Sequence, residues 1–309
     1  MATTTLPQKP AGKMRPLNIM RDLPKVAGLV ELCFKKKLGS EGKSYLAQMR
    51  SASNSLNSVP LKGYVWENQK NIIGNISIIP FRKAKKNVIL LANIAVHPDY
   101  RRKGIARALT QKGIKIAEKQ KAKSIWLHVD SENIGAINLY KELGFRPHSY
   151  RTTWHVGKEL SPLKKNPYIH ISSRKAHFWE AQNSWLGESY PEVIRWYRTP
   201  NFDIFKPGLM QWLHRLFVEY DIKQWAVQRD GELQALLMWK ETHTRRAPIW
   251  LATAPQADSE SLTTLLLYAR YQLASPKRVL NLNFLAGKYT SAFEQAGFSP
   301  QRTLLWMVK

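Results

Sequence analysis

The residues with the clearest capacity for chemistry lie in one stretch, Val88 to Gly144. A basic glycine turn, Arg101-Arg102-Lys103-Gly104, precedes a helical pattern in which Ile105, Leu109 and Ile116 share one face. The turn therefore stands at a helix N-terminus, where backbone N–H groups lack partners and the macrodipole is positive. Because Gly104 lets a ligand approach the backbone and the cations add charge, the stretch predicts a phosphate site.

The elements that must position this turn follow from the flanking residues. The apolar run Val88 to Val96 predicts a buried strand, and the helix extends from Gly104 to about Lys121. A second strand is expected over Ser124 to Asp130, and a second helix over Ile134 to Leu143, ended by Gly144. The order and lengths predict an α/β fold of the α+β type, with a mixed sheet and helices on both faces.

The glycine spacing fits neither the P-loop nor the dinucleotide fingerprint. Arg101-x-x-Gly104-x-Ala106, preceded by Asn93 to Pro98, instead resembles the acyl-CoA signature of the GNAT superfamily of N-acetyltransferases. Downstream, Asn133, Tyr140 and the pair Gly144-Phe145 stand where that family has them. The first half of the chain is most similar to ribosomal-protein-type peptide N-acetyltransferases.

The resemblance implies an enzyme that moves an acetyl group from acetyl-CoA to a primary amine by direct transfer, without a metal. Backbone groups of the strand end would hold the pantetheine arm, and the basic turn would hold the pyrophosphate. Tyr140 would be the proton donor, because a phenol with a reference pKa of about 10 stays protonated at neutral pH. The implied acetyl-CoA-binding residues are Ile94, Ala95, Val96, Arg101, Arg102, Lys103, Gly104, Ile105, Ala106, Arg107 and Asn133.

The general base is where the sequence departs from the family pattern. Ribosomal-protein-type enzymes have a glutamate five residues before the matching asparagine, and here that position is His128. An imidazole can also take a proton, directly or through water. A histidine satisfied on a covered sheet face is the alternative, and His97 or Glu67 could substitute as base. For Tyr140 the alternative is simple core packing.

Length and order indicate two domains. At 309 residues the chain exceeds one usual core. We expect a catalytic domain over residues 1–158, a proline-containing linker over 159–174 and a degenerate GNAT-like domain over 175–309. The pair Gly297-Phe298 repeats Gly144-Phe145, but the second half lacks the phosphate turn and has Phe293 where the first has Tyr140.

Composition bears on the cellular location of the protein and on the partners it could bind. The net charge is +26, and residues 1–158 hold 29 Lys and Arg against 9 Asp and Glu. An acidic or ribosomal partner is one interpretation of this charge, and a solvated face is the other. The sequence has no apolar segment long enough for a membrane and no signal peptide, so we expect a cytoplasmic protein. The single cysteine, Cys33, has no partner at metal spacing and is expected to be a buried, inert thiol.

Three functions stay open at this point. The first is acetyl-CoA-dependent acetylation of a peptide, protein or small-molecule amine. The second is a non-catalytic acyl-CoA-binding module. The third is a basic ribosome- or nucleic-acid-associated protein on a GNAT scaffold. Asn133 and Tyr140 beside the phosphate turn favour catalysis.

Overall fold

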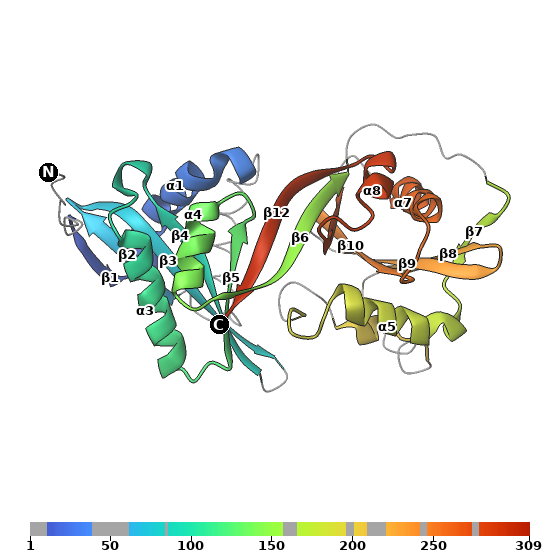
Figure 1. The fold of residues 1–309 in the computed structure, drawn as a ribbon, viewed down its shortest axis with the longest axis horizontal. Coiled ribbons are helices and arrows are strands. Elements are labelled where there is room, and N and C mark those ends of the chain that lie inside the picture. The colour runs from blue at the N-terminus through green and yellow to red at the C-terminus, as the bar shows by residue number, and fades with distance from the viewer. Residues whose placement is uncertain are drawn as a thin grey trace, which may run out of the picture. The chain divides into compact units, whose positions relative to one another are not determined.

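The computed structural model describes residues 11–38, 62–83, 86–156, 166–195, 201–208, 221–241, 246–273 and 278–309 (Figure 1). The sequence also predicts helices over residues 42–51 and 208–220, but the first and most of the second lie outside these residues. The chain forms two compact units, one of Met1–Ser149 with Leu304–Lys309 and one of Tyr150–Thr303. The expected domains, 1–158 and 175–309, differ from these units chiefly in the placement of the last strand.

The first unit is a mixed sheet in the order β1-β2-β3-β4-β5-β12. Neighbouring strands are antiparallel except β4 and β5, which are parallel. The strands are β1 (Lys13–Pro16), β2 (Lys62–Asn68), β3 (Asn71–Lys83), β4 (Lys86–Val96), β5 (Ser124–Asp130) and β12 (Phe298–Val308). The helices are α1 (Ile19–Leu38), α3 (Ile105–Lys119) and α4 (Ile134–Glu142), with a short 3-10 helix η1 (Pro98–Tyr100) before the basic turn.

Helices cover both faces of this sheet, α3 and α4 on one and α1 on the other (Figure 1). The face under α3 and α4 packs Ile105, Leu109 and Tyr140 against the alternate β5 residues Leu127 and Val129. The α1 face is a smaller core of buried residues, namely Val26, Leu29, Val30, Val65, Ile72 and Ala95. The period-2 alternation of β5 therefore separates its side chains between two different environments.

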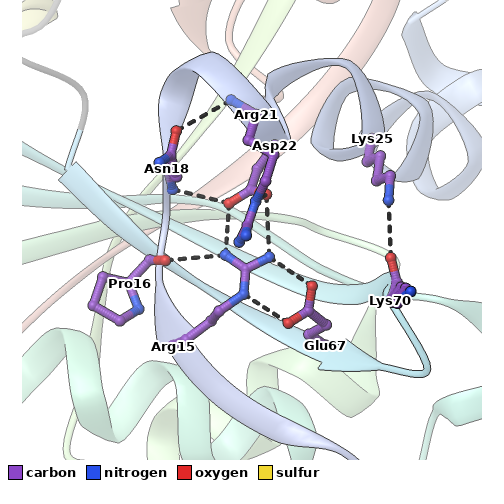
Figure 2. A network of polar contacts seen from close by, with 8 residues as sticks. All are labelled: Arg15, Pro16, Asn18, Arg21, Asp22, Lys25, Glu67 and Lys70. Carbon is purple, nitrogen blue, oxygen red and sulfur yellow. Dashed lines mark hydrogen bonds and ion pairs between the residues drawn. The ribbon is translucent and has the colours of Figure 1, made fainter.

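A polar network fixes α1 to the sheet (Figure 2). The guanidinium of Arg15 on β1 donates to both carboxylate oxygens of Asp22, at 2.6 and 3.1 Å, and to both of Glu67, at 2.8 Å. Because Asp22 stands just before Pro24 and an apolar helical pattern, the sequence predicts it as the N-cap of this helix, but α1 begins earlier, at Ile19. Asn18 is the capping residue, since its side-chain oxygen accepts from the backbone N–H of Arg21. Asp22 in turn accepts from the backbone N–H of Asn18, so the cap and the ion pairs form one unit.

The second unit repeats this plan. Its strands lie in the order β6-β11-β10-β9-β8-β7, with only β10 and β11 parallel. They are β6 (Arg146–Val156), β7 (Ile169–Ser173), β8 (Ile222–Arg229), β9 (Glu232–Lys240), β10 (Arg246–Thr253) and β11 (Val279–Leu285). Helices α7 (Ser259–Leu273) and α8 (Thr290–Gln295) lie across the sheet from α5 (Trp179–Ser189) (Figure 1). The described part of this unit also has two short 3-10 helices, η2 (Ala176–Phe178) and η3 (Phe202–Phe205).

Two strands differ from the sequence expectation. The segment expected as a linker contains β7, which pairs with β8 and alternates Ile169 and Ile171 with polar residues. The sequence predicts that a strand over residues 150–156 closes the first domain. This strand, which is part of β6, pairs instead with β11 through residues 151–155. Its place by β5 in the first unit is taken by the end of β12. The partner of a strand depends on residues far away in the sequence, so local patterns could not reveal this exchange.

Candidate active site

The basic turn forms the N-terminus of α3, as the sequence predicts. Gly104 is the N-cap residue in a left-handed conformation with φ of 78°, and Arg102 is also left-handed with φ of 62°. A Cβ added at Gly104 would meet no atom within 4 Å, so the space in front of this helix end is open. Beneath the turn, the side chain of Ile105 is buried in the core, and only its backbone faces the helix end. The arrangement suits an anion bound by backbone N–H groups.

The cations of the turn differ in their surroundings. Arg101 folds back so that its Nε donates to the carbonyl oxygen of Val96 at 3.2 Å. Arg107 is paired with Glu142 at the end of α4, and Lys103 lies over the ring of Tyr100 at 5.2 Å. Arg102, Lys103 and Arg107 are exposed, so the positive field remains at the helix end. The sequence places all four cations correctly at the turn but could not predict the partners of Arg101 and Arg107.

Strands β4 and β5 separate beside this turn. They are paired only from Val88 with Ser124 to Leu91 with Leu127, although β4 continues to Val96 and β5 to Asp130. Beyond Leu91, the side of β4 that faces β5 therefore has no ladder partner. Ile94 and Val96 pack toward the α3 face, and Ala95 packs toward the α1 face. The backbone at Ile94–Val96 can thus receive an extended ligand that enters between the two strands.

Tyr140 and Asn133 belong to α4, the helix that follows β5. Tyr140 is 6% exposed and packs edge-on to Phe145, with ring centroids 6.2 Å apart. Burial raises the pKa of its phenol above the ordinary value, so the proton is held more firmly than in a free tyrosine. Asn133 is the N-cap of α4, where its side-chain oxygen accepts from the backbone N–H of Ala136 at 3.2 Å. The side-chain oxygen of Asn133 is therefore hydrogen-bonded within the protein whether or not a ligand is bound.

His128 lies on the other face of β5 from Tyr140. Leu127 and Val129, its neighbours in the strand, belong to the core under α3 and α4, so the imidazole projects toward the α1 face. Its ring lies 4.0 Å from the ring of Trp306 on β12, with 37° between the planes. The two predicted catalytic side chains therefore lie on opposite faces of β5. No local signal in the sequence connects Trp306 with His128.

The two alternative bases have other surroundings. Glu67 is held by both Nε and Nη2 of Arg15, and this hydrogen bonding lowers the pKa of its carboxyl below the usual range. A carboxylate stabilised in this way is a weaker base than a free one. His97 lies at the end of β4, with its Nδ1 3.7 Å from Asp99 and its ring edge-on to Tyr100. These contacts favour His128 over Glu67 as the base.

The side chain of Cys33 contacts the end of β4. Its thiol donates to the carbonyl oxygen of Val96 at 3.4 Å, the same oxygen that accepts from Arg101. Burial raises the pKa of the thiol, although the contact with Arg101 acts in the opposite direction. The thiol is half-buried and protonated, which fits a packing residue.

The corresponding positions of the second unit are occupied by its own side chains. Asp258 caps α7 by accepting from the backbone N–H of Ser261 at 2.9 Å, and it also accepts from Arg229. A carboxylate therefore stands where the first unit has its cationic turn. On β10, the backbone N–H of Leu251 donates to the Tyr190 hydroxyl, and Tyr289 donates to the carbonyl oxygen of Ala254. These contacts agree with the degenerate character expected from the missing glycine turn.

Within the described ranges, no group of three or more His, Cys, Asp or Glu side chains is arranged so that it could hold a metal ion. None of the helices within those ranges has the length and apolar character needed to cross a membrane.

The two units share one architecture, a mixed sheet with helices on both faces, and the first unit also has the open, cationic helix N-terminus. Residues 28–145 match the profile of the acetyltransferase (GNAT) family, and this part of the chain belongs to that family. Over 65 residues, 21% of this chain, the sequence is 43% identical to the ribosomal protein bS18-alanine N-acetyltransferase of Escherichia coli (strain K12). The match spans 44% of that protein, and the chain spans less than half of each curated relative it matches.

Two solved structures share the fold over nearly the whole chain. A GCN5-related N-acetyltransferase from Sphaerobacter thermophilus superposes with a TM-score of 0.62 at 15% identity, covering 99% of this chain and 96% of that one. A tandem GNAT protein from the clavulanic acid biosynthesis pathway gives 0.54 at 14% identity, covering 96% and 98%. The chain therefore folds as two GNAT-like domains in tandem, as the sequence predicts.

Proposed function

We propose that this protein is an acetyl-CoA-dependent N-acetyltransferase whose first unit carries the reaction. One juxtaposition supports this most strongly. The open, cationic N-terminus of α3 follows the part of β4 that is no longer paired with β5, while Tyr140 packs on one face of β5 and His128 projects from the other. A phosphate site alone would not need either side chain.

The residues divide into a binding set and a reacting set. The N–H groups at the start of α3, with Arg102, Lys103 and Arg107, would hold the pyrophosphate of acetyl-CoA. The backbone of Ile94–Val96 would hold the pantetheine arm, because that side of β4 has no ladder partner. Bound acetyl-CoA supplies an activated acetyl thioester. The chain's own tasks are then to orient the acceptor and to move two protons.

His128 is the proposed base and Tyr140 the proposed acid. The acceptor amine must lose a proton as it attacks, and the imidazole on the α1 face would take it. The CoA thiolate must gain a proton as it leaves, and the phenol on the α4 side would give it. The raised pKa of Tyr140 keeps that proton in place before transfer. Having the two groups on opposite faces gives each substrate its own side of the sheet.

The proposed acceptor is the α-amine of a peptide or protein. The E. coli relative is named for acetylating the alanine of a ribosomal protein, and this supports a peptide N-terminus here. The charge of the first unit supports an acidic or ribosomal environment for that target. Four exposed lysines lie near the C-terminal end of α3, far along the helix from the proposed phosphate site, namely Lys115, Lys119, Lys121 and Lys123.

The decisive experiment is acetyl transfer by the full chain, read by mass spectrometry of the product. Peptides beginning with alanine, serine or methionine, amino sugars and small diamines would be incubated with acetyl-CoA. The proposal expects α-acetylated peptide, with Tyr140→Phe much slower. Acetyl-CoA binding without transfer to any class would favour the non-catalytic module. No acetyl-CoA binding, together with tight RNA binding, would favour the nucleic-acid-associated alternative.

A further inference from the structure

A row of lysines follows one side of α3. Lys112, Lys115 and Lys119 stand at positions i, i+3 and i+7, which share one face of a helix. Lys115 and Lys119 are exposed, and Glu118 is the only acidic residue of α3, a helix that the structure describes in full. Arg107, which pairs with α4, lies about 140° around the helix axis from Lys112. The row is therefore separate from the proposed pyrophosphate site, and the proposed reaction does not use its charge.

An aromatic row lies beside α3 on strand β2 (Figure 1). Tyr64 and Trp66 are half-buried and pack against the core under α3, whereas Val65 between them packs toward α1. The same alternation directs the exposed Lys62 to the α3 side of the sheet. Alternate residues of a strand are about 7 Å apart, so β2 presents a lysine and two aromatic rings in a regular line.

The two rows meet where Lys112 faces Tyr64. The Nζ atom of Lys112 lies over the ring of Tyr64, 4.9 Å from its centroid. A cation–π contact at a half-exposed site is weaker than the stacking of a nucleic-acid base on an aromatic side chain. A nucleotide brings a base for the ring and a phosphate for the ammonium group, so it would replace this contact with two stronger ones. An acidic polypeptide would satisfy the lysines but offers no base for the rings.

We propose that this surface binds single-stranded nucleic acid. Backbone phosphates pair with the lysines, and bases stack on the two aromatic rings, which is how proteins hold single strands without reading their sequence. A duplex fits less well, because its bases are already stacked on one another and do not present their faces. We call this surface the nucleic-acid platform, and its residues are Lys62, Tyr64, Trp66, Lys112, Lys115 and Lys119. The inference goes beyond the proposed acetyl transfer and does not depend on it, since the platform contains none of the proposed binding or reacting residues.

The first test removes the charge of the helix row. A variant with Lys112→Gln, Lys115→Gln and Lys119→Gln would be titrated into a fluorescent oligonucleotide of about 12 nucleotides at several salt concentrations. Each phosphate contact of a single strand contributes about 0.7 to the slope of log affinity against log salt, so we expect the slope to fall by about 2. The control removes the same charge from exposed lysines outside the platform and should keep the wild-type slope. Its three changes are Lys25→Gln, Lys70→Gln and Lys141→Gln.

The second test removes the rings and keeps the charge. Tyr64→Leu and Trp66→Leu should each lower the affinity for the oligonucleotide about tenfold and leave the salt slope unchanged. Tyr64→Phe keeps the ring and should bind the oligonucleotide as the wild type does. Calorimetry with acetyl-CoA reports whether each variant is correctly folded, and its affinity should be the same in all of them.

Four probes decide between the possible partners, namely single-stranded RNA, single-stranded DNA, an RNA duplex and polyglutamate. Tight binding of either single strand supports the platform, and the tighter of the two identifies the ligand. Equal binding of the duplex, competition by polyglutamate as strong as that by RNA, or equal loss of affinity in the control variant would overturn the inference. Wild-type protein that transfers acetyl groups but binds no oligonucleotide would overturn this inference alone. Wild-type protein that binds the oligonucleotide but not acetyl-CoA would refute only the proposed function.

Discussion

The imidazole of His128 on β5 lies against the indole of Trp306 on β12, with ring centroids 4.0 Å apart and 37° between the planes. The two residues are also direct partners in the antiparallel register of these strands. Trp306 is itself buried and meets Trp126 edge-on at 6.2 Å. The proposed base is therefore supported by a strand that follows the whole second unit in the sequence.

Trp306→Ala should damage both stability and catalysis. Removing a buried indole typically costs about 3–5 kcal/mol of unfolding free energy. It would also free the imidazole of His128 to change its orientation. Trp306→Phe, which keeps an aromatic ring beside His128, is the control and should cost much less. Denaturant unfolding measures the first effect, and the pH dependence of kcat measures the second. If both variants kept the wild-type pH profile, Trp306 would be a packing residue only.

Tyr140→Phe should slow turnover on the order of a hundredfold, the usual scale of general acid catalysis, and leave acetyl-CoA affinity nearly unchanged. Tyr150→Phe, at an exposed tyrosine, is the matched control and should have no effect. Because burial raises the pKa of Tyr140, the wild-type rate should show no decline from phenol ionisation up to about pH 10. Steady-state kinetics and calorimetry test these points. If turnover were unchanged, Tyr140 would have a packing role only.

Gly104→Glu should abolish acetyl-CoA binding, because it places a carboxylate in the open space before the α3 N-terminus. The same change at Gly231 is an unusually close control. Gly231 also has a positive φ, 85° against 78°, and open space around its Cβ position, but it lies in the β8–β9 hairpin of the second unit. Gly231→Glu should therefore show a similar loss of stability with normal binding. If the two variants bound acetyl-CoA equally well, the phosphate site could not lie at the N-terminus of α3.

Stability should fall in acid through the pair of Arg15 and Asp22. Burial alone would raise the pKa of Asp22, but hydrogen bonds from Arg15, the Asn18 backbone and Arg21 outweigh it and lower the pKa to about 2. An unfolded aspartate has a pKa near 3.9. The lowered folded-state value means that the stabilisation is complete above about pH 4 and is lost as pH falls toward 2. The difference amounts to roughly 2 kcal/mol.

Asp22→Asn should remove this pH dependence and lower stability at neutral pH, because Arg15 then keeps only the Glu67 carboxylate. Glu118→Gln, at an exposed acid on α3, is the control and should leave the acid transition unchanged. Urea unfolding at pH 2.5, 4 and 7 provides the measurement. If the wild type and Asp22→Asn lost the same unfolding free energy between pH 4 and pH 2.5, protonation of other carboxyl groups would explain the acid sensitivity.

The local elements around the site could be predicted closely from the sequence. The strand expected over Ser124 to Asp130 has those bounds, and the helices after Gly104 and Asn133 begin where expected. Hydrophobic period and turn chemistry determine such elements within a few neighbouring residues, which is why short patterns suffice. The position of Gly104 at the helix end follows from the same local rules.

Contacts between residues far apart in the chain could not be predicted from the sequence. Nothing near His128 indicates that Trp306 is its neighbour, and nothing near β6 indicates that β11 is its partner. Asn93 was visible in the motif, but its left-handed backbone, with φ of 53°, was not. Such facts depend on which strands meet, and strand pairing is a property of the whole fold.

The position of β12 also has a consequence for the order in which the protein can fold during its synthesis. Residues of β5 leave the ribosome long before Leu304–Val308, their antiparallel partners. Until the second unit has been translated, one edge of β5 presents unpaired N–H and C=O groups, with the apolar residues Leu127 and Val129 beside them. Exposed edges of this kind invite pairing with other chains. The nascent first unit is therefore most vulnerable to aggregation in this interval.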